Sequence, residues 1–500
     1  MSQTTKGVLL SYGSAAVNLV SSLILVPLLI RTLSEDTYSL YKVMQSFAGS
    51  LMMFNLGLST IAARAVARYV QRPTEDARRE KENTLALTIL LSLAMAGIVL
   101  LLGWAMTALV PHLFGDSYNA GQLSVAKKLV GIFSAATAVH ILSDTFRGFI
   151  LGREHYLVSQ GSSILFQTLR FCAMTSVALR GGNVCALALV DLALYGLLLG
   201  IHFLYSRLAL KETARLTSIK KTDLAPIAAF ASAIVIQALV TQASTNLDTV
   251  ILGVTGASPR IITMYASALT IYTVYRSLVG VLSGIYLPQA ARLTTANASG
   301  KALTDFLIHP SRIQAVITLG ILTGFGLLGR DFVRLWIGPE YLETWPLVLA
   351  LMAAAALPLI QSTCITLLDA KLMRLGRSLV LLVMAVLNAA ASLILVKPLG
   401  YWGPAIGTIL SLLLGEGLLM NLHYKKIFGL ELGRLFRQIF SGILPAALVS
   451  VVVSLPLAFF PADTFLELVR KGLVYLAVYL IAMWWLVPNR KKGAGHETRS

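Results

Sequence analysis

The sequence predicts an all-α polytopic membrane protein, and three observations support this fold class. The first is composition: 56% of the residues are hydrophobic and 13% are charged, whereas soluble domains carry about 25% charged residues. The second is the length of the apolar runs, which reach the roughly 20 residues that a helix needs to cross a bilayer. The third is the absence of alternating segments of about ten residues, which membrane β-barrels would show.

Hydropathy predicts about 14 membrane-spanning helices. Their ranges are 7–30, 38–63, 84–110, 129–151, 157–179, 184–206, 225–254, 261–291, 311–335, 345–369, 378–397, 401–422, 438–460 and 466–488. The first run is too long for the core of a signal peptide and no small-residue cleavage site follows it, so we keep it as a span.

Basic residues concentrate in alternate loops, after the second, sixth, tenth and twelfth spans and in the tail. Cytoplasmic loops retain Lys and Arg, so we expect both termini to be cytoplasmic in a multi-pass protein of the plasma or inner membrane. The net charge of +18 is spread over these loops and does not gather on one solvated face, which argues against a nucleic-acid partner. It indicates topology signals and contacts with membrane lipids that carry anionic headgroups.

The most polar internal break divides the predicted spans into two groups of six. Two six-helix lobes are the arrangement that a parallel internal repeat produces. The expected organisation is an N-lobe at 1–206, a basic cytoplasmic linker at 207–224, a C-lobe at 225–422, a basic cytoplasmic loop at 423–437, two further spans within 438–488, and a cytoplasmic tail at 489–500.

Polar residues recur at helical spacing on several spans, and such stripes face other helices or water because lipid excludes them. The stripes are Ser11, Ser14, Asn18 and Ser21 on the first span, Lys42 and Gln45 on the second, His140, Asp144 and Arg147 on the fourth, Gln237, Thr241, Ser244 and Asp248 on the seventh, and Tyr265, Tyr272, Arg276 and Ser283 on the eighth. For the Ser and Thr residues we favour hydrogen bonding between helices.

Charged groups inside spans are candidate functional residues, because a charge at the bilayer centre costs about 2.5–3.5 kcal/mol. We interpret Arg276 as a cavity-facing contact for an anion, and a structural pair with a carboxylate such as Asp144 or Glu416 is the alternative. Arg donates bidentately to phosphate or pyrophosphate. The candidate substrate-binding residues are Arg276, Arg147, Lys42, Asn18, Gln237 and Tyr272.

Four buried carboxylates are candidates for binding a coupling ion, H⁺ or Na⁺. They are Asp248, Asp144, Asp191 and Glu416. A satisfied structural role is the alternative for each, and Asp144 lies one turn from Arg147, within reach of an intrahelical pair. The three cysteines, Cys172, Cys185 and Cys364, lie in apolar runs and form neither a disulfide framework nor a metal-ligand pattern. We expect no metal and no cofactor.

A series of weak motifs follows in order along the chain and together carries a family resemblance. They are Tyr38-Ser-Leu-Tyr-Lys42, Asn55-Leu-Gly-Leu58 before Arg64, Asp144-Thr-Phe-Arg-Gly148, Asn246-Leu-Asp-Thr-Val-Ile-Leu-Gly253, Tyr265-Ala266 through Pro288, Leu335-Trp-Ile-Gly-Pro-Glu-Tyr341, and the pair Gly403 and Gly407. With these motifs the chain resembles the polysaccharide-transport branch, of the O-antigen flippase type, of the multidrug/oligosaccharidyl-lipid/polysaccharide (MOP) exporter superfamily. It departs from the family where Ser39 replaces a common Gly and Asn55 a common Asp.

The resemblance implies a V-shaped bundle of two lobes that opens alternately to each side of the membrane. It also implies a cargo, a lipid-pyrophosphate-linked oligosaccharide that moves from the cytoplasmic to the outer leaflet, with or without ion coupling, for cell-surface polysaccharide biosynthesis. A polysaccharide polymerase and glycosyltransferases are the implied protein partners.

Two other classes of function stay open at this point. A multidrug or cation antiporter of the same superfamily would need an acidic cavity, whereas the stripes here include several cations. A membrane glycosyltransferase or polymerase would need an acidic pair such as Glu35 and Asp36, but two neighbouring carboxylates in a turn are typical of a solvated helix cap. No Ser/His/Asp or metal constellation is found, so we expect a transporter and not an enzyme.

Overall fold

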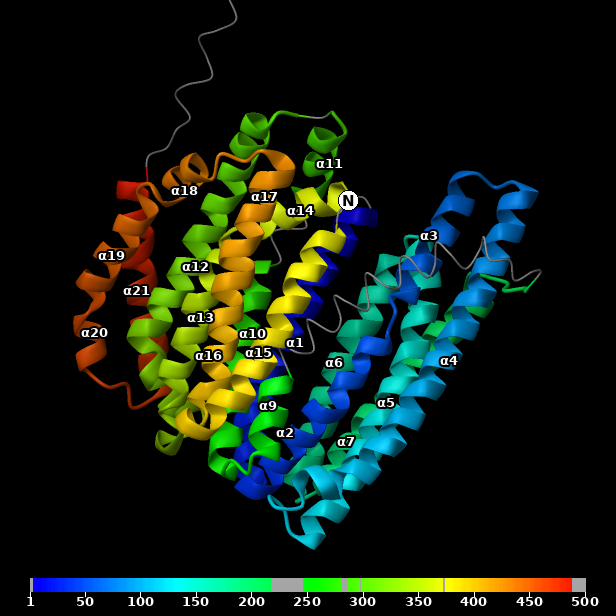
Figure 1. Cartoon of the computed structure of the whole chain (residues 1–500), viewed down its shortest axis with the longest axis horizontal. Helices are drawn as coiled ribbons and strands as arrows, with labels where there is room; N and C mark the ends of the chain where they lie inside the picture. The colour runs from blue at the N-terminus through cyan, green and yellow to red at the C-terminus, as the bar shows by residue number, and fades with distance from the viewer. Residues whose placement is uncertain (1–2, 217–245, 281–285, 297, 372–373, 488–500) are drawn as a thin grey trace, which may run out of the picture. The chain divides into compact units, whose positions relative to one another are not determined.

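The computed structural model describes residues 3–216, 246–280, 286–296, 298–371 and 374–487 (Figure 1). Those residues form helices and turns and contain no strand, which confirms the all-α fold. The chain divides into two compact units. Unit 1 comprises Met1–Thr270 with Leu381–Gly407, and unit 2 comprises Ile271–Val380 with Thr408–Ser500.

Ten helices among the described residues are long and apolar enough to cross a membrane, and a pair bent by 44°, Thr344–Ile360 with Ser362–Leu368, raises the number to as many as eleven. The sequence predicted about 14 spans. Part of the difference lies at 225–254 and 261–291, of which only α9 (Leu247–Val254) and α10 (Pro259–Gly280) fall within the described residues.

Unit 1 is built from long helices whose N-termini are capped by short polar side chains. Its elements are α1 (Gln3–Thr32), α2 (Glu35–Gly49), η1 (Ser50–Phe54), α3 (Leu58–Gln71), α4 (Glu75–Phe114), α5 (Ala120–Gly152), α6 (Tyr156–Leu179), α7 (Val184–Leu204), η2 (Tyr205–Ala209), α9, the first half of α10, and most of α15 (Arg374–Leu399) and α16 (Trp402–Leu410). Ser34, Thr74, Asn119 and Asn183 each accept a hydrogen bond from a free N–H of the first helical turn, which is the usual role of an N-cap.

The predicted span at 38–63 is broken in the middle. It forms α2, a short 3₁₀ turn and α3, and Gly57 between them adopts a left-handed conformation with φ of 63°. Glycine takes this conformation without the steric cost that a Cβ would add. The break places Asn55 at a turn inside the unit and not within a continuous helix.

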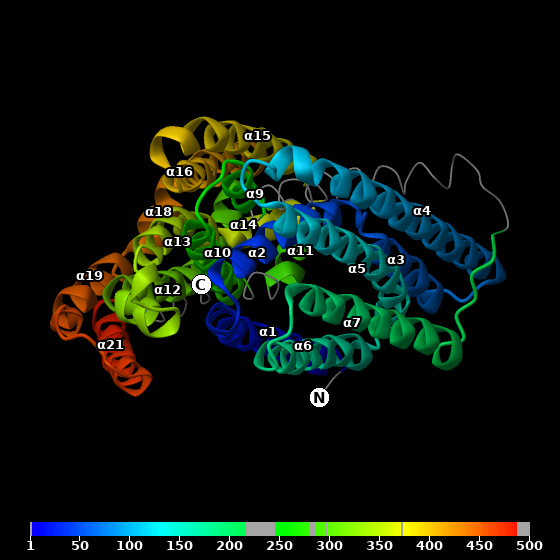
Figure 2. The ribbon, with the colours of Figure 1, turned by 90° about the horizontal axis from the view of Figure 1, so that it is seen from below.

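Helices α4, α5 and α7 pack side by side in unit 1, and α1 packs against α6 (Figure 2). Small residues permit the closest contacts. A Cβ at Gly148 of α5 would lie 2.3 Å from the backbone oxygen of Ser59 on α3. Gly148 and Gly152, one turn apart on α5, therefore form a packing surface for α3.

Unit 2 is arranged around α12 (Gly300–Trp336), which contacts α13, α18, α19 and α21. Its other elements are the second half of α10, α11 (Leu287–Thr295), η4 (Pro339–Tyr341), α13 (Thr344–Ile360), α14 (Ser362–Ala370), η5 (Ser411–Leu419), α17 (Met420–Phe428), α18 (Leu432–Phe440), α19 (Ile443–Ser454), α20 (Pro456–Phe459) and α21 (Phe465–Leu486). Tyr475 and Tyr479 of α21 donate hydrogen bonds of 3.0 and 2.6 Å to backbone oxygens of Gly320 and Val316 on α12. These bonds satisfy two phenol groups that would be costly to leave unpaired in an apolar environment.

Candidate functional site

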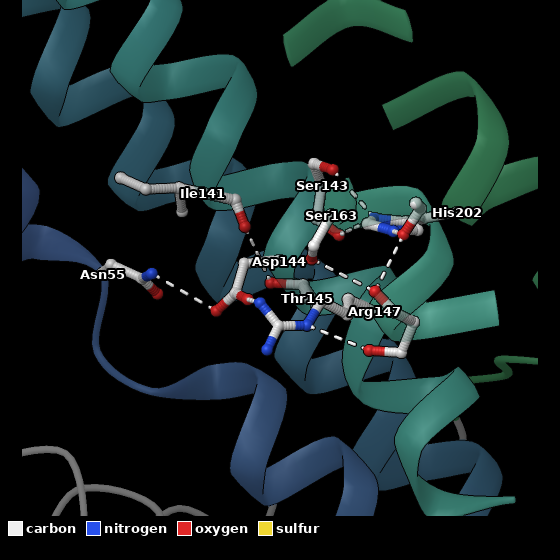
Figure 3. A network of polar contacts seen from close by, with 10 residues as sticks. Asn55, Ile141, Ser143, Asp144, Thr145, Arg147, Ser163 and His202 are labelled. Atoms are coloured by element: carbon white, nitrogen blue, oxygen red, sulfur yellow. Dashed lines mark hydrogen bonds and ion pairs between the residues drawn. The ribbon is translucent and has the colours of Figure 1, made fainter. Parts of the chain in front are cut away.

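A polar network in unit 1 joins α5 to the turn at Asn55 (Figure 3). Asn55 donates from Nδ2 to Asp144 Oδ2 at 3.3 Å, and Arg147 Nη1 lies 3.4 Å from Asp144 Oδ1. Arg147 Nε also donates to Ser159 Oγ on α6 at 3.3 Å. The carboxylate of Asp144 thus shares its two oxygens between an amide and a guanidinium, and both contacts are long. Arg147 keeps about a third of its side chain exposed, at 36%.

His202 extends this network on α7, and sequence reasoning did not single it out. Its Nδ1 lies 3.0 Å from Ser143 Oγ, and its Nε2 lies 3.0 Å from Ser162 Oγ. The ring is almost completely buried, and a hydroxyl faces each of its two nitrogens. A single histidine in an apolar run gave no signal, because its serine partners lie 40 and 59 residues away in the sequence.

A second charged group in unit 1 pairs α6 with α7. Arg170 donates from Nε to Asp191 Oδ1 at 2.6 Å and from Nη2 to Oδ2 at 3.2 Å, in a bidentate arrangement. Lys42 of α2 interacts electrostatically with both residues. One of these three side chains is acidic and two are basic, so basic groups outnumber acidic ones here.

Lys42 itself is held by its own helix. Its Nζ donates to Gln45 Oε1 at 3.3 Å and lies 5.8 Å from the ring centre of Tyr38. Spacings of three and four residues put these side chains on one face of α2. The Lys42 residue as a whole is half-buried.

Asp248, also in unit 1, sits in the first turn of α9. It is buried, and its Oδ2 accepts a hydrogen bond of 2.6 Å from the hydroxyl of Tyr265 on α10. Among the other predicted residues of this unit, Asn18 lies on an exposed position of α1. Gln237 lies outside the described residues.

Unit 2 brings together three predicted residues. The guanidinium carbon of Arg276 lies 5.6 Å from the ring centre of Tyr272, one turn earlier on α10. Glu416 interacts electrostatically with Arg276, although no salt bridge of 4.0 Å or less joins Arg276 to a carboxylate in the described part of the chain. Glu416 lies within η5, a π-helical segment, and such segments occur often at functional sites.

The candidate residues therefore form separate groups. Asp144 with Arg147 and Asp191 with Lys42 belong to unit 1, and Arg276 with Tyr272 and Glu416 belongs to unit 2. Within the described ranges, no cluster of three His, Cys, Asp or Glu side chains has the geometry to hold a metal ion. Each group combines a carboxylate with a cationic side chain, and the cations Arg147, Lys42 and Arg276 are hydrogen-bond donors that suit an anion.

Comparison with known proteins identifies the family. The family model described as "Polysaccharide biosynthesis protein" matches residues 4–293. The chain belongs to this family. The match covers more than half of the chain and includes the Lys42, Asp144, Arg147 and Arg276 positions. A search of curated proteins gives no match.

Solved structures show that the fold is that of the MOP exporters. The lipid II flippase MurJ in an inward closed conformation has a TM-score of 0.69 at 15% identity and covers 96% of this chain and 98% of its own. An inward-facing MATE family multidrug resistance transporter of the MOP superfamily has a TM-score of 0.63 at 14% identity, covering 83% and 95%. A MOP superfamily transporter from Pyrococcus furiosus has a TM-score of 0.52 at 13% identity, covering 85% and 95%. The family match confirms the sequence-based recognition of a polysaccharide family, and the solved structures show that the chain has the fold of these membrane transporters.

Proposed function

We propose that this family member is a flippase that moves a lipid-(pyro)phosphate-linked oligosaccharide from the cytoplasmic to the outer leaflet, for cell-surface polysaccharide biosynthesis. The observation that carries the proposal is the polysaccharide biosynthesis family match on a chain with an exporter fold. One structure of the same fold is a lipid II flippase.

Arg276 is the proposed contact for a headgroup phosphate. The Arg276 guanidinium lies over the ring of Tyr272, which orients it. Among the described residues, Glu416 is the acidic residue that interacts electrostatically with Arg276, and the two form no salt bridge of 4.0 Å or less. A planar guanidinium in this setting offers two parallel N–H donors to phosphate oxygens. Arg147 and Lys42 are proposed as further contacts, because each is only partly buried.

The proposed mechanism is alternating access. The cargo can move the equilibrium between two conformations only if it binds them with different free energies. Coupling to H⁺ or Na⁺ through Asp248, Asp144, Asp191 or Glu416 stays a prediction, as do the cytoplasmic termini, the plasma or inner membrane, and partnership with a polymerase and glycosyltransferases. Asp191 already has a bidentate partner, so we rank it last among the four.

Replacement of Arg276 in a cell that needs the glycan tests the proposal. We expect Arg276→Ala to lower surface glycan by about tenfold or more at normal protein level, and Arg276→Lys to fall between, because Lys keeps the charge but loses the bidentate geometry. Arg330→Ala is the matched control, since Arg330 is an exposed arginine of α12 in the same unit. Undiminished glycan in Arg276→Ala would count against the proposal.

The antiporter alternative gives a different result in a second assay. Efflux of a cationic dye by the wild-type protein, with no dependence of surface glycan on the protein, would favour a drug or cation antiporter of the MATE type. The flippase proposal predicts the reverse pattern.

A further inference from the structure

Glu212 lies three residues after η2, and its side chain has no exposed surface, which makes it the most deeply buried acid of the ion pairs in the described part of unit 1. Its Oε2 accepts from Lys81 Nζ of α4 at 2.7 Å, and its Oε1 accepts from Arg153 Nε, directly after α5, at 2.6 Å. The ring centre of Tyr69 on α3 lies 4.4 Å from Lys81 Nζ and 5.9 Å from the guanidinium carbon of Arg153. One carboxylate thus binds a cation from α4 and a cation from the end of α5, and both cations lie near the ring of Tyr69 on α3.

The backbone around Glu212 is shaped to present this side chain. Lys211 has a φ of 52°, in the left-handed region, which is uncommon for residues other than glycine and persists where the surroundings enforce it. The Glu212 N–H donates to Ser206 O at 3.0 Å, and Arg207 Nη1 donates to Glu212 O at 3.2 Å. The chain therefore turns back after η2 and aims the carboxylate inward.

A second set of contacts, made by Thr213 and Arg215, attaches the same segment to Glu82 of α4. Thr213 Oγ1 donates to Glu82 Oε1 at 2.7 Å, and the Arg215 N–H donates to Glu82 O at 3.2 Å. Between them, Ala214 packs against the buried cluster of Ala62, Val66, Leu85 and Phe149. Figure 2 shows the chain leaving α7 and running past the ends of α3 and α4.

We propose that Tyr69, Lys81 and Arg153 form a socket for Glu212, which we call the linker socket, and that it fastens residues 206–216 to unit 1. The carboxylate has no water contact, and loss of it would leave two cations partly buried without a counter-charge, which is strongly unfavourable. The nearby pair Arg68–Glu80 has the same 2.7 Å distance but side chains exposed by 71% and 61%, so it contributes little. The start of the linker is thus held firmly, and not tethered loosely.

The consequence for transport rests on the proposed function. Residues 206–216 include the start of the linker predicted at 207–224, so the socket fixes the place where this linker leaves the ends of α4 and α5. The socket is expected to support transport without touching the cargo.

Thiol labelling of purified protein in nanodiscs tests the socket directly. The reporter is Ala214→Cys in a background in which Cys172, Cys185 and Cys364 are replaced by Ser, and the probe is a maleimide. We expect Glu212→Gln to raise the labelling rate at position 214 about tenfold or more, because a freed segment exposes the packed residue. Glu80→Gln, which breaks the exposed pair, is the matched control and should leave the rate unchanged.

A conservative variant separates a local role from general damage. Glu212→Asp keeps a carboxylate for Lys81 and Arg153, so it should label much more slowly than Glu212→Gln and at a rate closer to that of the parent. Unchanged labelling in Glu212→Gln, or equal acceleration by Glu80→Gln, would overturn the socket. Because labelling needs no cargo, this result is independent of the glycan assay on Arg276, so failure of one proposal is distinguishable from failure of the other.

Discussion

The bidentate pair between Arg170 and Asp191 gives the sharpest stability prediction. Asp191→Asn keeps the size of the side chain and removes its charge, which leaves Arg170 beside Lys42 with no counter-charge between them. Removal of one partner from a buried pair costs about 3–5 kcal/mol. The Asp191 side chain is 8% exposed and that of Arg170 is 25% exposed, so part of the arginine charge keeps its solvation and we expect a loss near the lower end, about 3 kcal/mol.

The assay is thermal inactivation of purified protein in one detergent, recorded as the half-life at a fixed temperature because large membrane proteins unfold irreversibly. We expect Asp191→Asn to shorten the half-life strongly. The double variant Arg170→Met with Asp191→Leu should recover most of the loss, since replacing a whole buried pair by apolar groups of similar volume is often close to neutral. A long half-life in Asp191→Asn, or a double variant worse than the sum of the two single variants, would refute the reasoning.

Three further predictions use the same assay. Gly148→Ala should destabilise the protein by about 1–3 kcal/mol, because the added Cβ would meet the backbone of Ser59 at 2.3 Å. Gly161→Ala is the control: its Cβ would have no atom within 4 Å, so it should stabilise the protein by up to about 1 kcal/mol. Equal effects of the two variants would argue against the packing of Gly148 on α3. His202→Leu should cost about 1–3 kcal/mol, because two buried serine hydroxyls lose their partner, and an unchanged half-life would show that the ring bonds are dispensable. Gln361→Leu should cost a similar amount, since Gln361 exchanges two hydrogen bonds of 2.7 and 2.9 Å with Asn421; an Asn421→Leu loss that adds fully to it would contradict the coupling.

The fold class follows from the sequence because lipid imposes one rule on every span: apolar side chains outside and all backbone hydrogen bonds inside the helix. That rule acts over about 20 consecutive residues and is readable locally. It does not register a break made by a single turn, and the interruption of the second span at Gly57 depends on one glycine and its neighbours. The sequence predicts the span itself, and Glu35–Gln71 is one of the candidate spans, but it does not predict the turn inside that span.

Only part of the candidate site can be predicted from the sequence. Charged residues at membrane depth stand out in the sequence, and Asp144 with Arg147 could be paired because they share a helix turn. Pairing across helices is different: Arg170 and Asp191 lie 21 residues apart, and Lys81 and Glu212 lie 131 apart. Such pairs depend on the depth and rotation of each helix, which hydropathy does not specify. Glu212 was hidden among basic residues of a loop predicted to be solvated.

Asp248 has two candidate roles. Its hydrogen bond with Tyr265 fits a structural role, and its buried carboxylate fits a site for a coupling ion. Substitution of Asp248 by Asn with transport measured in H⁺ and in Na⁺ gradients separates the two.

Translocation in proteoliposomes tests the central claim most directly. Purified protein would be reconstituted with a fluorescent pyrophosphate-linked lipid oligosaccharide, and the fraction that reaches the opposite leaflet would be measured by quenching from outside. We predict that the wild-type protein accelerates translocation over protein-free liposomes and that Arg276→Ala removes most of that acceleration while Arg330→Ala does not. A wild-type rate equal to that of the empty liposomes, or an Arg276→Ala rate equal to the wild type, would contradict the account.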